Sequence, residues 1–107
     1  MLKIIKDITF EKIHIILKNN NVIIGNLYAV VRDNLCTLLS LYIKDDCRNN
    51  GYGTLLLKKF IKICKNKKIK QIELDDASDN FNKNNNIYLK NGFSYIKDGY
   101  PEMILCI

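Results

Sequence analysis

The first 43 residues of the chain consist of apolar segments that short polar turns separate. The segments are rich in isoleucine, valine and tyrosine, which are residues that favour β-strands. Three consecutive asparagines at residues 19–21 predict a turn, because asparagine tolerates left-handed backbone conformations. The pattern therefore predicts four strands, at residues 3–10, 12–19, 22–31 and 35–43.

Two features refine this prediction. Gly25 lies inside the third apolar segment, where an isolated glycine predicts a bulge or a bend. The segment at residues 35–43 is the longest apolar run, and a run of this kind is typical of a strand that is buried on both faces. We therefore expect residues 35–43 to form a central strand.

The spacing of apolar residues then changes to a helical period and predicts a helix over about residues 53–66. The residues predicted to form its buried face are Leu57, Phe60, Ile61 and Cys64. After the helix, the pattern predicts a short strand at residues 71–76 and a polar loop at residues 77–86. Two further apolar segments, at residues 93–98 and 102–107, predict a hairpin.

The turn before the predicted helix carries Arg48, Gly51 and Gly53 in an Arg-x-x-Gly-x-Gly pattern. Backbone N–H groups at a helix N-terminus lack internal partners and attract anions, and glycine lets a phosphate approach the backbone closely. A P-loop would need a lysine after the last glycine, where Thr54 stands. A dinucleotide-binding fingerprint would need a third glycine, where Leu56 stands.

A second motif follows at residues 86–93, with Tyr88 four residues before Gly92 and Phe93 next. Together the two motifs, and the strand between them, resemble the GNAT superfamily of acetyl-CoA-dependent N-acetyltransferases. The resemblance implies an α/β (α+β) fold with a mixed central sheet of about six to seven strands and two helices. The chain is expected to form one domain over residues 1–107. The chain departs from the family in having no room for helices between its first two strands.

The resemblance also implies acetyl-CoA as co-substrate. The backbone around Leu41, Tyr42 and Ile43 is expected to pair with the pantetheine arm like an added strand. The residues expected to hold the pyrophosphate are Arg48, Asn49, Asn50, Gly51, Tyr52, Gly53 and Thr54. Tyr88 is expected to protonate the thiolate that leaves, since the ordinary pKa of a phenol is well matched to that of an alkyl thiol.

The general base is less well defined by the sequence. The central strand contains no carboxylate, whereas Asp75 and Asp76 end the following strand and alternate in direction. One of them could accept the proton of the amine through water or bind the ammonium group. The alternative is that both are turn or helix-capping residues. Asn85 and Asn86 lie near the asparagine that many family members carry before the tyrosine, but they are out of register with it.

The composition of the chain argues against nucleic-acid binding and against a metal site. The net charge of +6 comes mostly from lysine on and after the predicted helix, which is typical of a solvated helix face. With few arginines and no aromatic platform, the chain does not favour nucleic-acid binding. Cys36, Cys47, Cys64 and Cys106 form no C-x-x-C pair, so no metal is expected, and Cys64 and Cys106 are predicted to be core thiols.

No apolar run is long enough to predict a membrane span, and no signal peptide is visible, so a cytoplasmic location is expected. The function predicted is direct transfer of an acetyl group from acetyl-CoA to an amine in a ternary complex. The acceptor would be a protein lysine, a protein N-terminus or a small amine. The alternative is a non-catalytic module that binds acyl-CoA or a protein. The missing helices leave the acceptor side open, which predicts either a peptide-like acceptor or a homodimer.

Overall fold

The computed structural model of the chain describes residues 1–77 and 86–107. Its elements, in chain order, are β1 (Leu2–Ile8), β2 (Lys12–Asn19), β3 (Val22–Arg32), β4 (Leu35–Ile43), the 3-10 helix η1 (Asp45–Cys47), α1 (Tyr52–Asn66), β5 (Gln71–Asp75), α2 (Ile87–Lys90), β6 (Ser94–Tyr95) and β7 (Glu102–Cys106). The turn predicted at the asparagines is confirmed, with Asn20 and Asn21 in the left-handed region at φ 51° and 70°. Most of the loop predicted at residues 77–86 lies outside the described residues.

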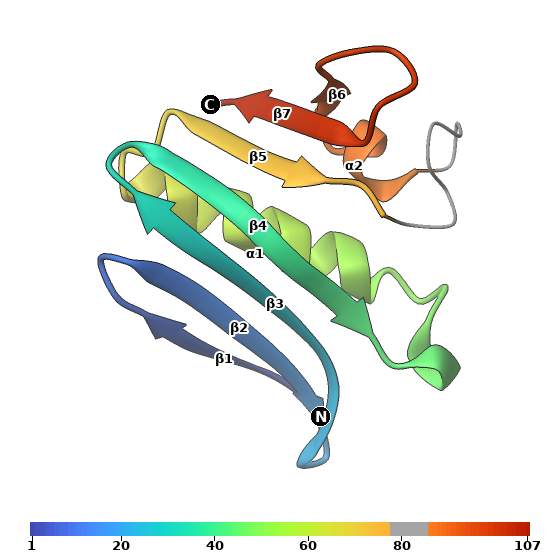
Figure 1. Cartoon of the computed structure of the whole chain (residues 1–107). Helices are drawn as coiled ribbons and strands as arrows, with labels where there is room; N and C mark the ends of the chain where they lie inside the picture. The colour runs from blue at the N-terminus through green and yellow to red at the C-terminus, as the bar shows by residue number, and fades with distance from the viewer. Residues whose placement is uncertain (78–85) are drawn as a thin grey trace.

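The strands form one mixed sheet in the order β1-β2-β3-β4-β5-β7-β6 (Figure 1). Neighbouring strands are antiparallel except β4 and β5, which are parallel and which α1 connects. A parallel connection needs a long crossover, and the helix supplies it. The predicted fold class is confirmed, although β6 covers only two residues of the longer strand that was predicted there.

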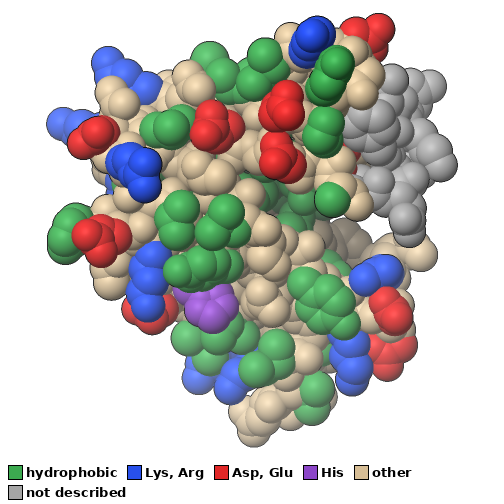
Figure 2. Space-filling model, viewed as in Figure 1, with side chains coloured by type: hydrophobic (Ala, Val, Ile, Leu, Met, Phe, Trp, Pro, Cys, Tyr) green, Lys and Arg blue, Asp and Glu red, His purple; other side chains and the backbone are tan. Residues whose placement is uncertain are grey.

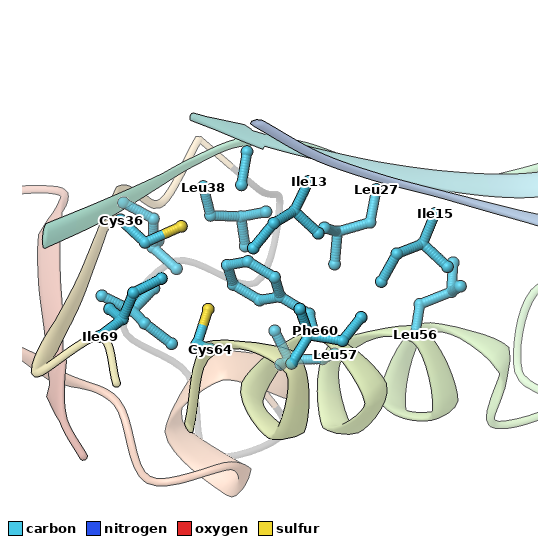
Figure 3. Close-up of a cluster of buried hydrophobic side chains, with 14 of the residues drawn as sticks. Ile13, Ile15, Leu27, Cys36, Leu38, Leu56, Leu57, Phe60, Cys64 and Ile69 are labelled. Carbon is cyan, nitrogen blue, oxygen red and sulfur yellow. The ribbon is translucent and has the colours of Figure 1, made fainter. Parts of the chain in front are cut away.

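The core lies between the sheet and α1, which packs against β2, β3 and β4 (Figure 3). The predicted buried face of the helix is confirmed at Leu57, Phe60 and Cys64, which are fully buried. Ile61 is only partly buried, and Leu56 is fully buried instead, so the face is rotated slightly from the prediction. In Figure 1 α1 lies behind the sheet, and the face toward the viewer has no helix in front of it in the part of the chain that is described.

The prediction that Cys106 is a core thiol was wrong, because its side chain is exposed. Cys106 pairs with Gln71 and points to the face of the sheet that α1 does not cover. Met103, at an alternate position of the same strand, is fully buried on the other face. The error followed from treating an apolar strand end as buried on both sides, whereas only one face of β7 has a partner layer.

Two bulges adjust the central strands. The predicted irregularity at Gly25 is confirmed, since Leu17 pairs with Gly25 whereas Lys18 pairs with Ile23, which leaves Ile24 as an extra residue. A second bulge, in β4, was not predicted. There Tyr28 pairs with Ser40 and the next residue of β3 pairs with Leu38, so Leu39 is the extra residue.

The bulge at Leu39 decides which residues of β4 face the helix layer. Leu38 is buried on the α1 side, and without a bulge the next residues on that side would have even numbers. The extra residue reverses the alternation, because a bulge shifts one strand against its neighbour by one residue. Leu41 and Ile43 consequently pack against the core on the α1 side, close to the start of that helix.

The strands β4 and β5 pair over a short distance and then part. Residues 35–37 pair with residues 71–73, and β5 continues beside β7 only. Between Leu38 and Ile43, the edge of β4 that faces β5 therefore has no strand partner among the described residues. This opening leaves backbone hydrogen-bonding groups of β4, in the middle of the sheet, without a strand partner in the described part of the chain.

Candidate active site

The chain turns sharply between β4 and α1. Asn49 and Gly51 both have left-handed backbone conformations, with φ of 65° and 80°. Gly51 is the N-cap of α1, and a residue with a Cβ would be strained at this angle. No side chain caps the helix, and its first turn contains no acidic residue. The first N–H groups of α1 are therefore not satisfied by a side-chain cap, and the positive end of the helix dipole faces no fixed carboxylate of its own first turn.

Gly53 allows α1 to begin close to α2. A Cβ at this position would lie 2.9 Å from Cδ1 of Ile87, which is too close for two carbon atoms. The second glycine of the motif thus has a packing role between the two helices. The first glycine has a conformational role, whereas at the second a side chain would displace the terminal methyl group of Ile87.

Arg48 spans the turn. Its Nε donates to the carbonyl oxygen of Ile43 at 2.9 Å, and its Nη2 lies 3.0 Å from Oδ1 of Asp45. Its guanidinium carbon lies 5.9 Å from the centre of the Tyr42 ring. The side chain is about half exposed, so part of its charge remains available to a ligand. These contacts hold a cation beside the N-terminus of α1.

A cleft of about 670 Å³ lies between the end of β4, the start of α1 and α2. The residues that line it are Leu41, Ile43, Cys47, Arg48, Asn49, Gly51, Tyr52, Gly53, Thr54, Ala77, Ile87, Tyr88 and Lys90. Most of the residues predicted to bind the cofactor are therefore brought together, and Tyr88 joins them from the distant second motif. Among the described residues, the lining contains the cations of Arg48 and Lys90 and no carboxylate.

Two of the residues predicted to bind the cofactor do not line this cleft. Tyr42 points to the opposite face of the sheet, as strand alternation after the bulge requires, and its ring contacts Arg48. Asn50 binds its own loop, since its Nδ2 donates to the carbonyl oxygens of Cys47 and Arg48 at 3.1 and 3.3 Å. Both side chains thus shape the loop around Arg48 and do not face the cleft.

Sequence reasoning missed other residues of the cleft. Ile87 and Lys90 precede and follow Tyr88 on the same short helix, so the proximity of Tyr88 was the signal that could have found them. Cys47 lies one residue before the motif, at the end of η1. Ala77 follows β5, and only the parting of the strands brings it to the cleft.

Tyr88 is held by the start of α2. Oδ1 of Asn86 accepts hydrogen bonds from the N–H groups of Tyr88 and Leu89, at 2.8 and 3.1 Å, and so caps the helix. The Tyr88 ring packs edge-on against Phe93, with the ring centres 6.0 Å apart. Burial, together with the nearby charge of Asp76, raises the pKa of Tyr88 to about 12. The phenol is therefore protonated at every physiological pH.

The two candidate aspartates lie in different surroundings. Asp76 is only 2% exposed, and its Oδ2 accepts hydrogen bonds from Nδ2 of Asn86 and from the hydroxyl of Tyr95, both at 2.7 Å. Asp75 is exposed on the face of the sheet that α1 does not cover. Of the two candidate asparagines, Asn86 is the helix cap, whereas Asn85 lies outside the described residues.

A second, smaller cleft of about 300 Å³ lies over the parted strands, on the face of Asp75. Its lining includes the carboxylates of Glu73, Asp75 and Glu102 and the exposed apolar side chains of Leu39 and Ile96. Asp75 and Glu102 are directly opposite each other on β5 and β7. Figure 2 shows this face, with acidic side chains gathered over β5 and β7.

Comparison with known proteins agrees with this geometry. The sequence model of the acetyltransferase (GNAT) family matches residues 3–93. No curated protein sequence matches the chain. Among solved structures, the chain is similar to the PaiA N-acetyltransferase of Thermoplasma acidophilum in complex with coenzyme A, with 26% identity and a TM-score of 0.79. That match covers 91% of this chain and 62% of the Thermoplasma protein, so the chain spans less than two-thirds of its length.

Two further structures have the same fold. A GNAT-family acetyltransferase of Staphylococcus aureus Mu50 is 25% identical with a TM-score of 0.75, over 89% of this chain and 67% of that protein. The ribosomal-protein-S18-alanine N-acetyltransferase of Escherichia coli is 18% identical with a TM-score of 0.77, over 94% of this chain and 72% of that protein. With the family match over residues 3–93 and the cleft built from both sequence motifs, the chain belongs to the GNAT family of acetyltransferases.

Proposed function

We propose that this chain transfers an acetyl group from acetyl-CoA to the nitrogen of an amine. The observation that carries the proposal is the convergence of three features in one cleft. These are the α1 N-terminus without a side-chain cap, the cation of Arg48 and the protonated phenol of Tyr88. They lie beside the edge of β4, where that strand has parted from β5.

The lining of the cleft suits acetyl-CoA as co-substrate. The pyrophosphate is anionic, and Arg48 with the backbone N–H groups of the α1 N-terminus would hold it. The pantetheine arm carries amide groups, and the edge of β4 at residues 41–43 would pair with them as with an added strand. The Thermoplasma PaiA structure contains coenzyme A, which supports this assignment.

Tyr88 would act as the general acid. When the amine nitrogen attacks the carbonyl carbon of the thioester, a C–N bond forms and the C–S bond breaks. The sulfur leaves as a thiolate, and the phenol of Tyr88 would give it a proton. Burial raises the pKa of this phenol to about 12, which keeps it protonated and also makes it a weaker acid than the ordinary tyrosine that the sequence predicted. A positioned acid of this kind contributes about 10²–10⁴-fold to rate.

The acceptor amine would approach from the opposite face, through the smaller cleft. Like charges directly opposite on neighbouring strands destabilise a sheet, and Asp75 faces Glu102 in this way. A cation placed between them would relieve that repulsion, and Leu39 and Ile96 would contact its methylene groups. We therefore propose an acceptor with a positive charge in addition to the reacting amine, such as a polyamine or a lysine in a basic peptide. Asp75 would bind its ammonium group or take up the proton that the reacting nitrogen releases.

A panel of acceptors tests the proposal. The protein would be incubated with acetyl-CoA and, separately, with a linear polyamine, a lysine-containing basic peptide, an acidic peptide of equal length and a peptide with a free N-terminus. Mass spectrometry would detect the added acetyl group. We expect acetylation of the polyamine or the basic peptide and much less of the acidic one. Binding of acetyl-CoA without acetylation of any acceptor would favour the non-catalytic module.

A further inference from the structure

We propose that Asp76 is a positioning residue, which holds Tyr88 over the cleft through the cap residue Asn86. The inference rests on the proposed function in one respect, namely that Tyr88 is the general acid. It assigns to Asp76 a role other than that of a base, and it follows from a hydrogen-bonded chain that links β5, β6 and α2.

The chain of contacts begins at the Asp76 carboxylate. Oδ2 of Asp76 accepts from Tyr95 and from Asn86 at 2.7 Å each, and the N–H of Asp76 donates to the carbonyl oxygen of Pro101 at 2.8 Å. Asp76 and Asn86 are 2% and 0% exposed. A buried carboxylate with these contacts ties the end of β5 to the hairpin and to the start of α2.

Asp76 also fixes the orientation of the Asn86 amide. A side-chain amide has a donor end and an acceptor end, and only the acceptor end can cap a helix. Because the carboxylate of Asp76 accepts from Nδ2, the oxygen of Asn86 points to the N–H groups of Tyr88 and Leu89. The helix has only four residues, so few internal hydrogen bonds support it and the cap matters more than in a long helix.

The charge of Asp76 has a second effect on Tyr88. It opposes ionisation of the phenol, and together with burial it raises the pKa of Tyr88. The other charged or titratable side chains around Tyr88 in the described part of the chain are Cys47, Arg48 and Tyr52 across the cleft and Lys90 on α2. Asp76 is the charged group that raises the pKa of Tyr88, after the larger effect of burial.

Asp76→Asn separates charge from hydrogen bonding. The amide oxygen of asparagine can accept from Tyr95 and Asn86 as the carboxylate does, but it carries no charge. Asp98→Asn makes the same change at an exposed turn of the hairpin and serves as the matched control. Because Asp76→Asn keeps the acceptor oxygen, we expect it to change kcat by less than about twofold, whereas Asp76→Ala, which removes the acceptor, should lower kcat by about tenfold with less than about twofold change in KM for acetyl-CoA. Asp98→Asn should leave both values unchanged.

A measurement without turnover keeps this inference separate from the proposed function. Protein labelled with ¹³C in its tyrosine rings would be titrated by NMR, and the signal of Tyr88 would be assigned by its loss in Tyr88→Phe. We expect Asp76→Asn to lower the pKa of Tyr88 from about 12 toward the ordinary value, and Asp98→Asn to leave it unchanged. This result would stand even if no acceptor were acetylated.

Asn86→Ser tests the same link if Asp76→Ala does not fold, as circular dichroism would show. Serine can still cap α2 but is too short to reach Asp76 at the same time. We expect kcat to fall by about tenfold with KM for acetyl-CoA little changed. Unchanged kcat in folded Asp76→Ala or Asn86→Ser would overturn the positioning role, and an unchanged Tyr88 titration in Asp76→Asn would overturn the effect of the Asp76 charge on Tyr88.

Discussion

The two sides of the opening between β4 and β5 differ in depth and in charge. On the helix side, a cleft of about 670 Å³ carries Arg48 and Lys90 and the N-terminus of α1. On the open side, a cleft of about 300 Å³ carries Glu73, Asp75 and Glu102. The first surface suits an anion and the second a cation, although β4 contributes residues to both. The difference arises because the cations come from the turn before α1 and from α2, whereas the carboxylates come from alternate positions of β5 and from β7.

This contrast gives each reactant its own side in the proposed function. The anionic co-substrate would enter on the helix side, and a cationic amine would enter on the open side. Their reacting atoms would then meet where the strands have parted, and Tyr88 lies on the side of the leaving group. The predictions that follow change one side at a time, so each can show whether the two sides are in fact separate.

The largest effect is expected for Tyr88→Phe. This change removes the proton donor for the thiolate and keeps the ring that packs on Phe93. We expect kcat to fall by about 10²-fold with little change in the affinity for acetyl-CoA. Tyr100→Phe, at an exposed turn, is the matched control and should have no effect. Steady-state kinetics would check both, and unchanged turnover with chemistry shown to be rate-limiting would remove Tyr88 from the mechanism.

Arg48→Ala should weaken the binding of acetyl-CoA on the helix side and leave the open side unchanged. The loss of a half-exposed charged contact to phosphate is expected to raise Kd for acetyl-CoA by about tenfold. Arg32→Ala is the control, because the chain has one other arginine and it is exposed at the end of β3. Calorimetric titration would measure both variants. An equal loss of affinity in the two variants would indicate non-specific attraction by net charge and would contradict the assigned phosphate site.

The loss of folding stability at alkaline pH should show how far the Tyr88 phenol is shielded from solvent. Its folded-state pKa, about 12, lies above the ordinary value, so the stability linked to its proton is present below about pH 10 and is lost as the pH rises toward 12. Between about pH 10 and about pH 11 the free energy of unfolding of the wild type should fall by about 1 kcal/mol more than that of Tyr88→Phe. Urea denaturation at both pH values would measure the difference. Parallel losses in the two proteins would show that the phenol is not shielded from solvent.

The smallest effect is expected on the open side. Glu73→Gln combined with Asp75→Asn removes exposed negative charge, which should raise KM for a polyamine by about two- to fivefold and leave KM for acetyl-CoA unchanged. The effect should shrink at high salt. Kinetics with a polyamine and with a neutral monoamine would check this. If both amines were affected equally, the acidic cleft would not select for charge.

The sequence was most informative where structure is local. The turn at residues 48–53 needed a left-handed residue at Gly51 and a missing side chain at Gly53, and both requirements are visible as glycines. The start of α1 was predicted within one residue, because its apolar spacing is regular and its preceding turn is polar. The gathering of Tyr88 with Arg48 was expected from the resemblance to the family, and the cleft contains both.

What the sequence did not predict depends on contacts between distant segments. The bulge at Leu39 leaves no local signal, yet it decides that Leu41 and Ile43 face the cleft. Asp75 and Asp76 were expected to point in opposite directions, but the packing of α2 and β6 decides that Asp76 is the buried one. Their roles, like those of the cofactor-binding residues, remain predictions that the experiments above address.

The central claim is that the cleft at the start of α1 binds the phosphates of acetyl-CoA, and calorimetry with two ligands tests it most directly. The protein would be titrated with acetyl-CoA and with acetyl-pantetheine, which has the same thioester and arm but lacks the pyrophosphate. We expect micromolar to millimolar affinity for acetyl-CoA and at least about tenfold weaker binding of acetyl-pantetheine. Equal affinities, or no binding of acetyl-CoA, would contradict the assignment of the cleft.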